Sequence, residues 1–203
     1  MGDVEALAVQ AADVLRRGGV VAYPTDTFYG LAVDPRNADA VAMLFALKGR
    51  DAGKPSPLIV GSLEQAGMAV AFNPLAERLA ARFWPGPLSL VLPVTATATA
   101  TWCRAAIGGG TTAAIRVPAH DLARAIAHAF GFCITATSAN VSGRPPARTP
   151  AEIDPEVAAR VDLVVDGVTP GGEVSTIVDV TEHPARLVRA GAIPWERVLE
   201  SLQ

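Results

Sequence analysis

The chain has 203 residues, of which 50% are hydrophobic and 18% charged, and its formal net charge is −3. This composition excludes a disordered chain and suffices for the core of one domain, which we expect to span residues 1–203. No apolar run approaches the roughly 20 residues of a spanning helix, and residues 1–5 lack the start of a secretory signal. We therefore expect a cytoplasmic protein without membrane attachment.

Helix and strand patterns alternate through most of the chain. Apolar residues at helical spacing predict a first helix that Asp3 caps and Gly18 ends. The next helices are predicted at 37–47, after Ser62, at 73–82 and at 120–130, and the strands at 20–23, 58–60, 88–94, 112–117 and 133–137. Residues 95–110, rich in Thr, Ala and Gly, are predicted to form a flexible loop or an irregular crossing.

The last third of the chain is dense in strands and turns. A helix start is predicted at Thr149, followed by strands at 163–165, 176–180 and 186–189 and a closing helix at 194–202. Such a mixture predicts an α/β fold in which helices pack on a mixed sheet, rather than a purely parallel one.

Residues 23–31 contain more hydroxyl-bearing and aromatic side chains than a chain reversal needs. They follow a short apolar strand that should stop at Pro24, which cannot donate to a sheet ladder. A simple turn would use Gly, Asn, Asp and Pro, and would not need Thr25, Thr27 and Tyr29 together. We expect a site in this loop; a polar turn with a buried tyrosine is the alternative.

A cationic stretch follows the predicted helix at 37–47. Lys48, Arg50 and Lys54 surround Gly49 and Gly53, and three cations beside two glycines suit an oligophosphate. A solvated helix C-terminus is the competing interpretation, because Lys and Arg are favoured there in any case.

A second group of polar residues follows the strand at 133–137. Ser138 and Asn140 are two apart, so in extended geometry they face the same way, and Ser142 and Arg148 add further donors. An Asx-type turn before Gly143 is the alternative interpretation.

Arg116 lies in an otherwise apolar strand. A buried guanidinium needs a partner, which is either a substrate carboxylate or an internal salt bridge. Ser175 and Arg189 are weaker candidates that depend on the fold bringing them to the cleft. No metal site is predicted, because the cysteines and histidines are scattered.

Together these blocks resemble the YrdC-like threonylcarbamoyl-adenylate synthase family in its short form. The resemblance covers about residues 5–195 and rests on seven blocks in order: 23–31, 48–55, 83–87, 116–118, 137–143, 175–179 and 189–192. It implies an open, twisted mixed sheet with a concave basic groove. It also implies an enzyme that condenses L-threonine, bicarbonate or CO2, and ATP into threonylcarbamoyl-AMP and pyrophosphate, for the N6-threonylcarbamoyl modification of adenosine 37 in tRNA.

The resemblance also implies roles for individual residues. Lys48, Arg50, Ser138 and Asn140 would be catalytic; Lys54, Ser142, Arg148, Ser175 and Arg189 would bind ATP; Thr25, Tyr29 and Arg116 would bind threonine. Mg²⁺ would be carried by the ATP phosphates, since no carboxylate cluster is evident. tRNA and the proteins of the transferase complex are the expected partners.

Two other functions fit parts of the sequence. A noncatalytic RNA-binding module would use the same basic groove, but an isoelectric point of about 5.6 and the lack of clustered aromatics weaken it. A carbamoyl-transfer domain like that of hydrogenase maturation proteins is disfavoured, because that family's zinc-finger and acylphosphatase segments are missing.

Overall fold

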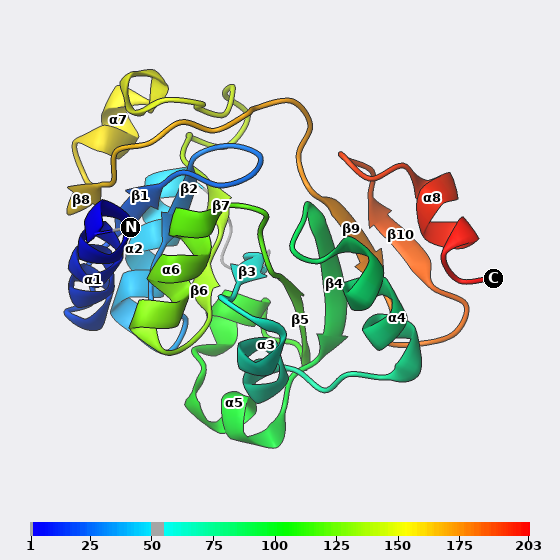
Figure 1. Cartoon of the computed structure of the whole chain (residues 1–203). Helices are drawn as coiled ribbons and strands as arrows, with labels where there is room; N and C mark the ends of the chain where they lie inside the picture. Colours follow the sequence, from blue (N-terminus) through cyan, green and yellow to red (C-terminus); the bar gives the residue numbers. More distant parts are fainter. Residues whose placement is uncertain (1, 50–54) are drawn as a thin grey trace.

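The computed structural model describes residues 2–49 and 55–203, and within them two β-sheets carry helices on their faces (Figure 1). The smaller sheet has the order β7-β2-β1-β8. Its strands are β1 (Val21–Tyr23), β2 (Gly30–Ala32), β7 (Thr137–Ser138) and β8 (Leu163–Val164). The larger sheet has the order β10-β9-β4-β5-β3-β6. Its strands are β3 (Leu58–Ile59), β4 (Leu88–Pro93), β5 (Thr112–Arg116), β6 (Ile134–Thr135), β9 (Thr176–Asp179) and β10 (Arg186–Arg189).

Both sheets are mixed, which confirms the predicted fold class. In the smaller sheet β1 pairs antiparallel with β2 and parallel with β8. In the larger sheet β4 pairs antiparallel with β5 and parallel with β9. Strand β2 was not predicted, because we assigned Gly30 and Leu31 to the loop that precedes it.

One continuous strand segment passes directly from the larger sheet into the smaller one. The strand predicted at 133–137 is divided at Ala136, so that β6 belongs to the larger sheet and β7 to the smaller one. Thr135 Oγ1 accepts a hydrogen bond from Val33 N at 2.9 Å, and Thr135 N donates to Val33 O at 3.2 Å. Ser138 and Asn140 therefore follow directly on the junction between the sheets.

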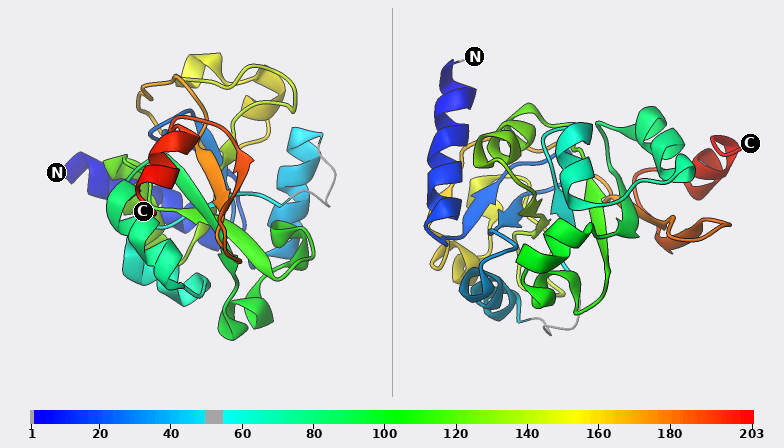
Figure 2. Two further views of the ribbon diagram at one scale, coloured as in Figure 1. Left: turned by 90° about the vertical axis from the view of Figure 1, so that its right-hand side faces the viewer. Right: turned by 90° about the horizontal axis from the view of Figure 1, so that it is seen from below.

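The helices cover the sheets from several sides (Figures 1 and 2). They are α1 (Gly2–Arg16), α2 (Ala38–Lys48), α3 (Leu63–Ala69), α4 (Pro74–Phe83), α5 (Ala96–Thr101), α6 (Asp121–Phe130), α7 (Pro155–Ala158) and α8 (Trp195–Glu200), with 3-10 turns η1 (Arg104–Ile107) and η2 (Pro150–Glu152). Helices α1 and α6 pack together through buried alanines such as Ala8, Ala11 and Ala123, whose small side chains permit a close approach. The two termini lie at opposite ends of the molecule (Figure 1).

Local caps set both ends of α2. Asn37 Oδ1 accepts from the N–H groups of Asp39 and Ala40 at 3.1 Å, which caps α2. Gly49 ends the same helix with a φ of 55°, a left-handed conformation that glycine adopts at little cost. These caps fix where α2 stops, and so they fix the position of Lys48.

Other local predictions are wrong. Residues 95–110 contain α5 and η1 instead of a loop, because the Thr95 hydroxyl caps α5 by accepting from Ala98 N at 3.2 Å. The start predicted at Thr149 yields only η2, because the Glu152 carboxylate accepts from Arg148 N instead of completing a capping box. The first helix begins at Gly2, so Asp3 lies inside its first turn.

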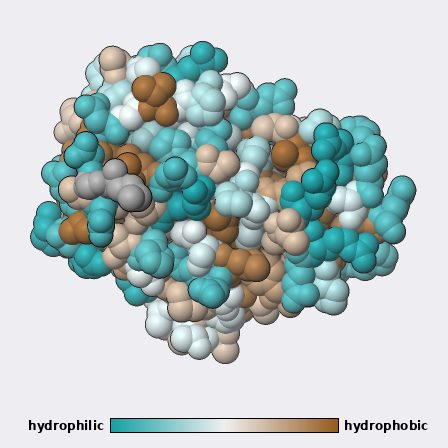
Figure 3. All heavy atoms as spheres, in the orientation of Figure 1, coloured by the Kyte–Doolittle hydropathy of each residue, from teal (hydrophilic) through white to brown (hydrophobic). Residues whose placement is uncertain are grey.

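The exposed surface mixes hydrophilic and hydrophobic side chains. On the face seen in Figure 1, hydrophobic residues show as separate patches among hydrophilic ones (Figure 3). Within the described ranges, the helices are too short or too polar to cross a bilayer.

Candidate functional site

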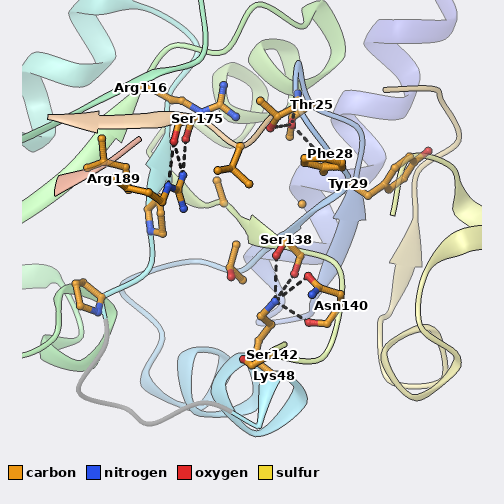
Figure 4. Close-up of a pocket in the computed structure, with 18 of the residues that line it drawn as sticks. Thr25, Phe28, Tyr29, Lys48, Arg116, Ser138, Asn140, Ser142, Ser175 and Arg189 are labelled. Carbon is orange, nitrogen blue, oxygen red and sulfur yellow. Dashed lines mark hydrogen bonds between the residues drawn. The ribbon is translucent and has the colours of Figure 1, made fainter. Parts of the chain in front are cut away.

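A cavity of about 440 Å³ lies where the two sheets meet. Segments from both sheets line it, and they include nine of the predicted site residues: Thr25, Tyr29, Lys48, Arg116, Ser138, Asn140, Ser142, Ser175 and Arg189. In Figure 4 the group around Lys48 lies on one side, and Arg116, Ser175 and Arg189 lie on the other. The fold thus brings together residues that are far apart in the chain.

Lys48 sits in the last turn of α2 and is almost fully buried, with 4% exposure. Its Nζ donates to the carbonyls of Ser138 and Asn140 at 2.5 and 2.6 Å. The Ser138 hydroxyl and the Asn140 side-chain oxygen lie farther away, both at 3.3 Å. The predicted association of Lys48, Ser138 and Asn140 is therefore present as direct contacts (Figure 4).

The 138–143 loop is held against the end of α2. Ser142 N donates to Lys48 O at 3.1 Å, and Asn140 Nδ2 donates to Val141 O at 3.0 Å and to Arg144 O. The Asn140 amide thus braces the turn as a donor, which differs from an Asx-type turn, in which the side-chain oxygen accepts from a backbone N–H. The same residue also lines the cavity.

Hydroxyl groups organise the loop at 24–29. Thr25 Oγ1 donates to Phe28 O at 2.7 Å, accepts from Thr27 N at 3.1 Å and lies 3.1 Å from Thr27 Oγ1. Both threonines are buried and line the cavity. These hydrogen bonds between side chains and backbone stabilise a tight turn beside the cavity.

Tyr29 lines the cavity, but its hydroxyl points away from it (Figure 4). The hydroxyl oxygen lies 2.8 Å from Gly167 O and 3.1 Å from Val165 O. Burial, with a contribution from Asp166, raises the pKa of Tyr29 to about 12. The Tyr29 side chain therefore anchors the loop to the segment after β8.

Arg116 forms the internal salt bridge that was one of its two predicted alternatives. Its Nη1 donates to Asp26 Oδ1, and the two side chains are 6% and 7% exposed. Arg116 nevertheless lines the cavity as well.

Ser175 directly precedes β9, and Arg189 is the last residue of β10, the edge strand of the larger sheet. The Arg189 guanidinium donates to Ser175 O through Nε at 3.0 Å and through Nη2 at 2.7 Å, and Nη2 also reaches Ser175 Oγ at 2.9 Å. The antiparallel pairing of β9 and β10 brings the two residues together. Both weaker candidates thus reach the cleft.

Three predicted site residues are not placed at the cavity. Arg50 and Lys54 lie outside the described residues. Arg148 is exposed and is not among the lining residues; a Cβ added at Gly171 would lie 2.3 Å from its Nε, so its side chain runs over that glycine.

Further lining residues were not predicted as site residues. Thr27, Phe28 and Thr137 are examples, and Thr137 precedes Ser138 on β7. The extended-geometry argument placed Ser138 and Asn140 on one face, whereas the consecutive residues Ala136, Thr137 and Ser138 all line the cavity. Asp26 lies within the 23–31 block, but it was not predicted as a partner of Arg116.

The described lining is cationic. Lys48, Arg116 and Arg189 belong to it, and none of the described lining residues is Asp or Glu. Within residues 2–49 and 55–203, no group of three or more His, Cys, Asp or Glu side chains is arranged to hold a metal ion. The geometry suits an anionic ligand bound by cations, hydroxyls and amides.

Comparison with known proteins places this site in a family. The family model for Sua5, YciO and YrdC proteins, described as "Telomere recombination", matches residues 13–191. A threonylcarbamoyl-AMP synthase from Halorhodospira halophila is 45% identical over 184 residues, covering 90% of each chain. One from Pyrococcus abyssi is 38% identical over 190 residues, which cover 93% of this chain but only 55% of that relative.

Solved structures show the same fold. Sua5 from P. abyssi, crystallised with L-threonine, superposes with a TM-score of 0.90 at 36% identity over 98% of this chain and 58% of that one. E. coli YciO superposes with a TM-score of 0.84 at 25% identity over 96% of this chain and 93% of that one. The match of the family model across most of the chain, with these relatives, shows that the chain belongs to the Sua5/YciO/YrdC family.

Proposed function

We propose that this chain is a threonylcarbamoyl-AMP synthase, which joins L-threonine, bicarbonate or CO2, and ATP and releases pyrophosphate. The observation that carries the proposal is the contact of the Lys48 ammonium with Ser138 and Asn140 in a cavity that Arg116 and Arg189 also line. Relatives named for this activity match most of the chain.

The lining fits a reaction in which negative charge accumulates on phosphate. The threonine amine attacks CO2, and the resulting carbamate oxygen attacks the α-phosphorus of ATP, so that pyrophosphate leaves. Such catalysis needs positioning and charge stabilisation more than a protein nucleophile. The Lys48 ammonium lies 3.3 Å from the side-chain oxygens of Ser138 and Asn140, and these are long hydrogen bonds. In the proposed reaction, phosphate oxygens replace these two acceptors at the ammonium.

The two sides of the cavity receive different parts of the substrates. The oligophosphate lies near Lys48, Ser138, Asn140 and Ser142, with Arg50 and Lys54 as further predicted contacts. Ser175 and Arg189 hold other parts of ATP. Threonine lies near Thr25 and Arg116, and its carboxylate meets the Arg116 guanidinium. The presence of a threonine complex of a 36% identical Sua5 supports threonine as the amino acid.

Mg²⁺ enters this scheme as part of the MgATP substrate. The described lining offers hydroxyls, amides and cations instead of the carboxylates that Mg²⁺ prefers, so the phosphates and water would supply its ligands. We also propose that the protein acts in the cytoplasm and passes its product to a tRNA-modifying transferase.

The decisive experiment measures pyrophosphate release with threonine, bicarbonate and ATP omitted one at a time. We expect release only when all three are present, together with formation of threonylcarbamoyl-AMP. Pyrophosphate release without threonine would contradict the proposal. RNA binding that depends steeply on salt, with no consumption of ATP, would favour the noncatalytic RNA-binding module instead.

A further inference from the structure

We propose that Asp26 is a positioning residue for threonine, which acts by fixing the orientation of the Arg116 guanidinium. This inference rests on the proposed function, because it takes threonine as the ligand of Arg116. Asp26 was not among the predicted site residues, and the cavity lining does not include it. Its effect on a substrate would therefore be transmitted through Arg116.

One nitrogen of the Arg116 guanidinium binds the protein, and the other two are available to a ligand. Its Nη1 is bound to Asp26, whereas Nε and Nη2 have no hydrogen-bond partner within residues 2–49 and 55–203. Of the described side chains, the fully buried polar atoms that lack a partner are Ser56 Oγ and Trp102 Nε1. Nε and Nη2 of Arg116 are not among them, so neither atom is fully buried, and Arg116 lines the cavity. Those two donors form the fork that grips a carboxylate.

Asp26 is itself held at both oxygens. Oδ1 accepts from Arg116, and Oδ2 accepts from Ala119 N at 3.0 Å, just before α6 begins. Its side chain is 7% exposed, so it has little freedom to move. The carboxylate thus ties the 24–29 loop to the segment before α6, and it holds the Arg116 guanidinium at Nη1.

The pairing has two physical consequences for the ligand. A guanidinium held at one nitrogen loses less rotational freedom when a carboxylate binds the other two, which favours binding. The Asp26 charge also offsets that of Arg116, so the cavity does not hold an uncompensated buried cation before the amino acid enters. Without Asp26, Arg116 would keep its charge but lose its fixed direction.

The test compares threonine binding by calorimetry in the wild type and in the variants Asp26→Asn, Arg116→Met and the two combined. We expect Asp26→Asn to raise the Kd for threonine between about tenfold and a hundredfold, because a misplaced group loses its contact. In the Arg116→Met background the same change should alter the Kd less than about twofold, since Asp26 would then have nothing to orient. In the pyrophosphate assay, the KM for threonine should rise more than the KM for ATP.

Two further variants separate positioning from folding. Asp34→Asn is the matched control, because Asp34 pairs with Arg36 at 2.9 Å outside the cavity lining, and it should leave the Kd unchanged. Asp26→Glu keeps the charge but displaces the carboxylate, so it should also weaken threonine binding. This variant replaces Asp26→Asn in the test if Asp26→Asn does not fold. An unchanged Kd in a folded Asp26 variant, or the same fold-change in both backgrounds, would overturn the inference. Wild-type protein that releases pyrophosphate without threonine would instead overturn the proposed function.

Discussion

Lys48 combines a structural and a chemical task in one side chain. Its ammonium bridges the carbonyls of Ser138 and Asn140, and so it holds the 138–143 loop at the end of α2. Its residue type and its spacing from Arg50 were enough to propose it from the sequence. Its partners were predicted only through the family resemblance, because contacts between residues ninety positions apart depend on the fold.

Replacing Lys48 with alanine should reduce turnover on the order of a hundredfold or more, the loss seen when a charged or polar donor to a transition-state oxygen is removed. Steady-state pyrophosphate release gives kcat, and circular dichroism shows whether the fold survives. Arg78→Ala is the control, since Arg78 is exposed on α4 and outside the cavity lining, and its turnover should match the wild type. A near-normal kcat in Lys48→Ala would remove this residue from the mechanism.

At the scale of elements, the start of α6 carries a titratable cap. The His120 Nδ1 accepts from Ala123 N at 3.4 Å, so the ring caps the helix only while that nitrogen is unprotonated. Burial has the largest effect on the His120 ring and lowers its pKa below 6.5. A hydrogen bond with the Val168 backbone and the charges of Asp26 and Asp121 act in the opposite direction.

This cap makes stability depend on pH. Above pH 6.5 His120 is neutral in both states, so its contribution is fully present; as the pH falls below 6.5, the unfolded chain takes up the proton first and stability falls. His120→Asn keeps a good cap that does not titrate. We expect the variant's unfolding temperature to fall less than that of the wild type between pH 7.5 and 5. Parallel pH profiles for the two proteins would contradict this assignment.

The β9–β10 edge leaves no room for a side chain at Gly191. A Cβ there would lie 2.1 Å from Val174 O and 2.7 Å from Ser175 C, and backbone atoms cannot yield as a flexible side chain can. Gly191→Ala should therefore destabilise the protein by about 1–3 kcal/mol and raise the KM for ATP by displacing Ser175.

Gly67→Ala provides the opposite case. A Cβ at this exposed position in α3 meets nothing within 4 Å, so the change should stabilise the protein by roughly 0.5–1 kcal/mol through helix propensity. Chemical denaturation measures both variants. Equal stabilities for Gly191→Ala and the wild type would mean that the edge is looser than its geometry indicates.

Most elements could be predicted from the sequence because their signals are local. The helix starts predicted at Ser62 and at residue 73 depend on side-chain oxygens that accept from an N–H three residues on, and both form as expected. The division of residues 133–138 at Ala136 has no such signal, because it follows from hydrogen bonds to Val33 and Pro57. The same holds at the site: residue types suggested Arg116, but only the fold identifies Asp26 as its partner.

For the whole molecule, the cavity lies across the junction of the two sheets, and each sheet supplies one half of it. Lys48, Ser138 and Asn140 accompany the smaller sheet, whereas Arg116, Ser175 and Arg189 belong to the larger one or flank its strands. The strand segment from β6 to β7 connects them directly, and the Asp26–Arg116 ion pair is a further contact between the halves. A ligand that touches both halves adds another contact, so it should stabilise the two sheets together.

This arrangement predicts how substrates change the cooperativity of the fold. With MgATP and threonine each at 100 times its Kd, every ligand adds about 2.7 kcal/mol to the free energy of unfolding. Hydrogen exchange should then slow at the amides of β5 in the larger sheet and of β7 in the smaller one by similar factors, because opening either sheet destroys the shared binding site. Threonine alone should protect β5 and the 24–29 loop more than the 138–143 loop. If both substrates together protect the amides of only one sheet, the two halves of the cavity act independently. The proposal that residues from both sheets bind the nucleotide and the amino acid together would then be wrong.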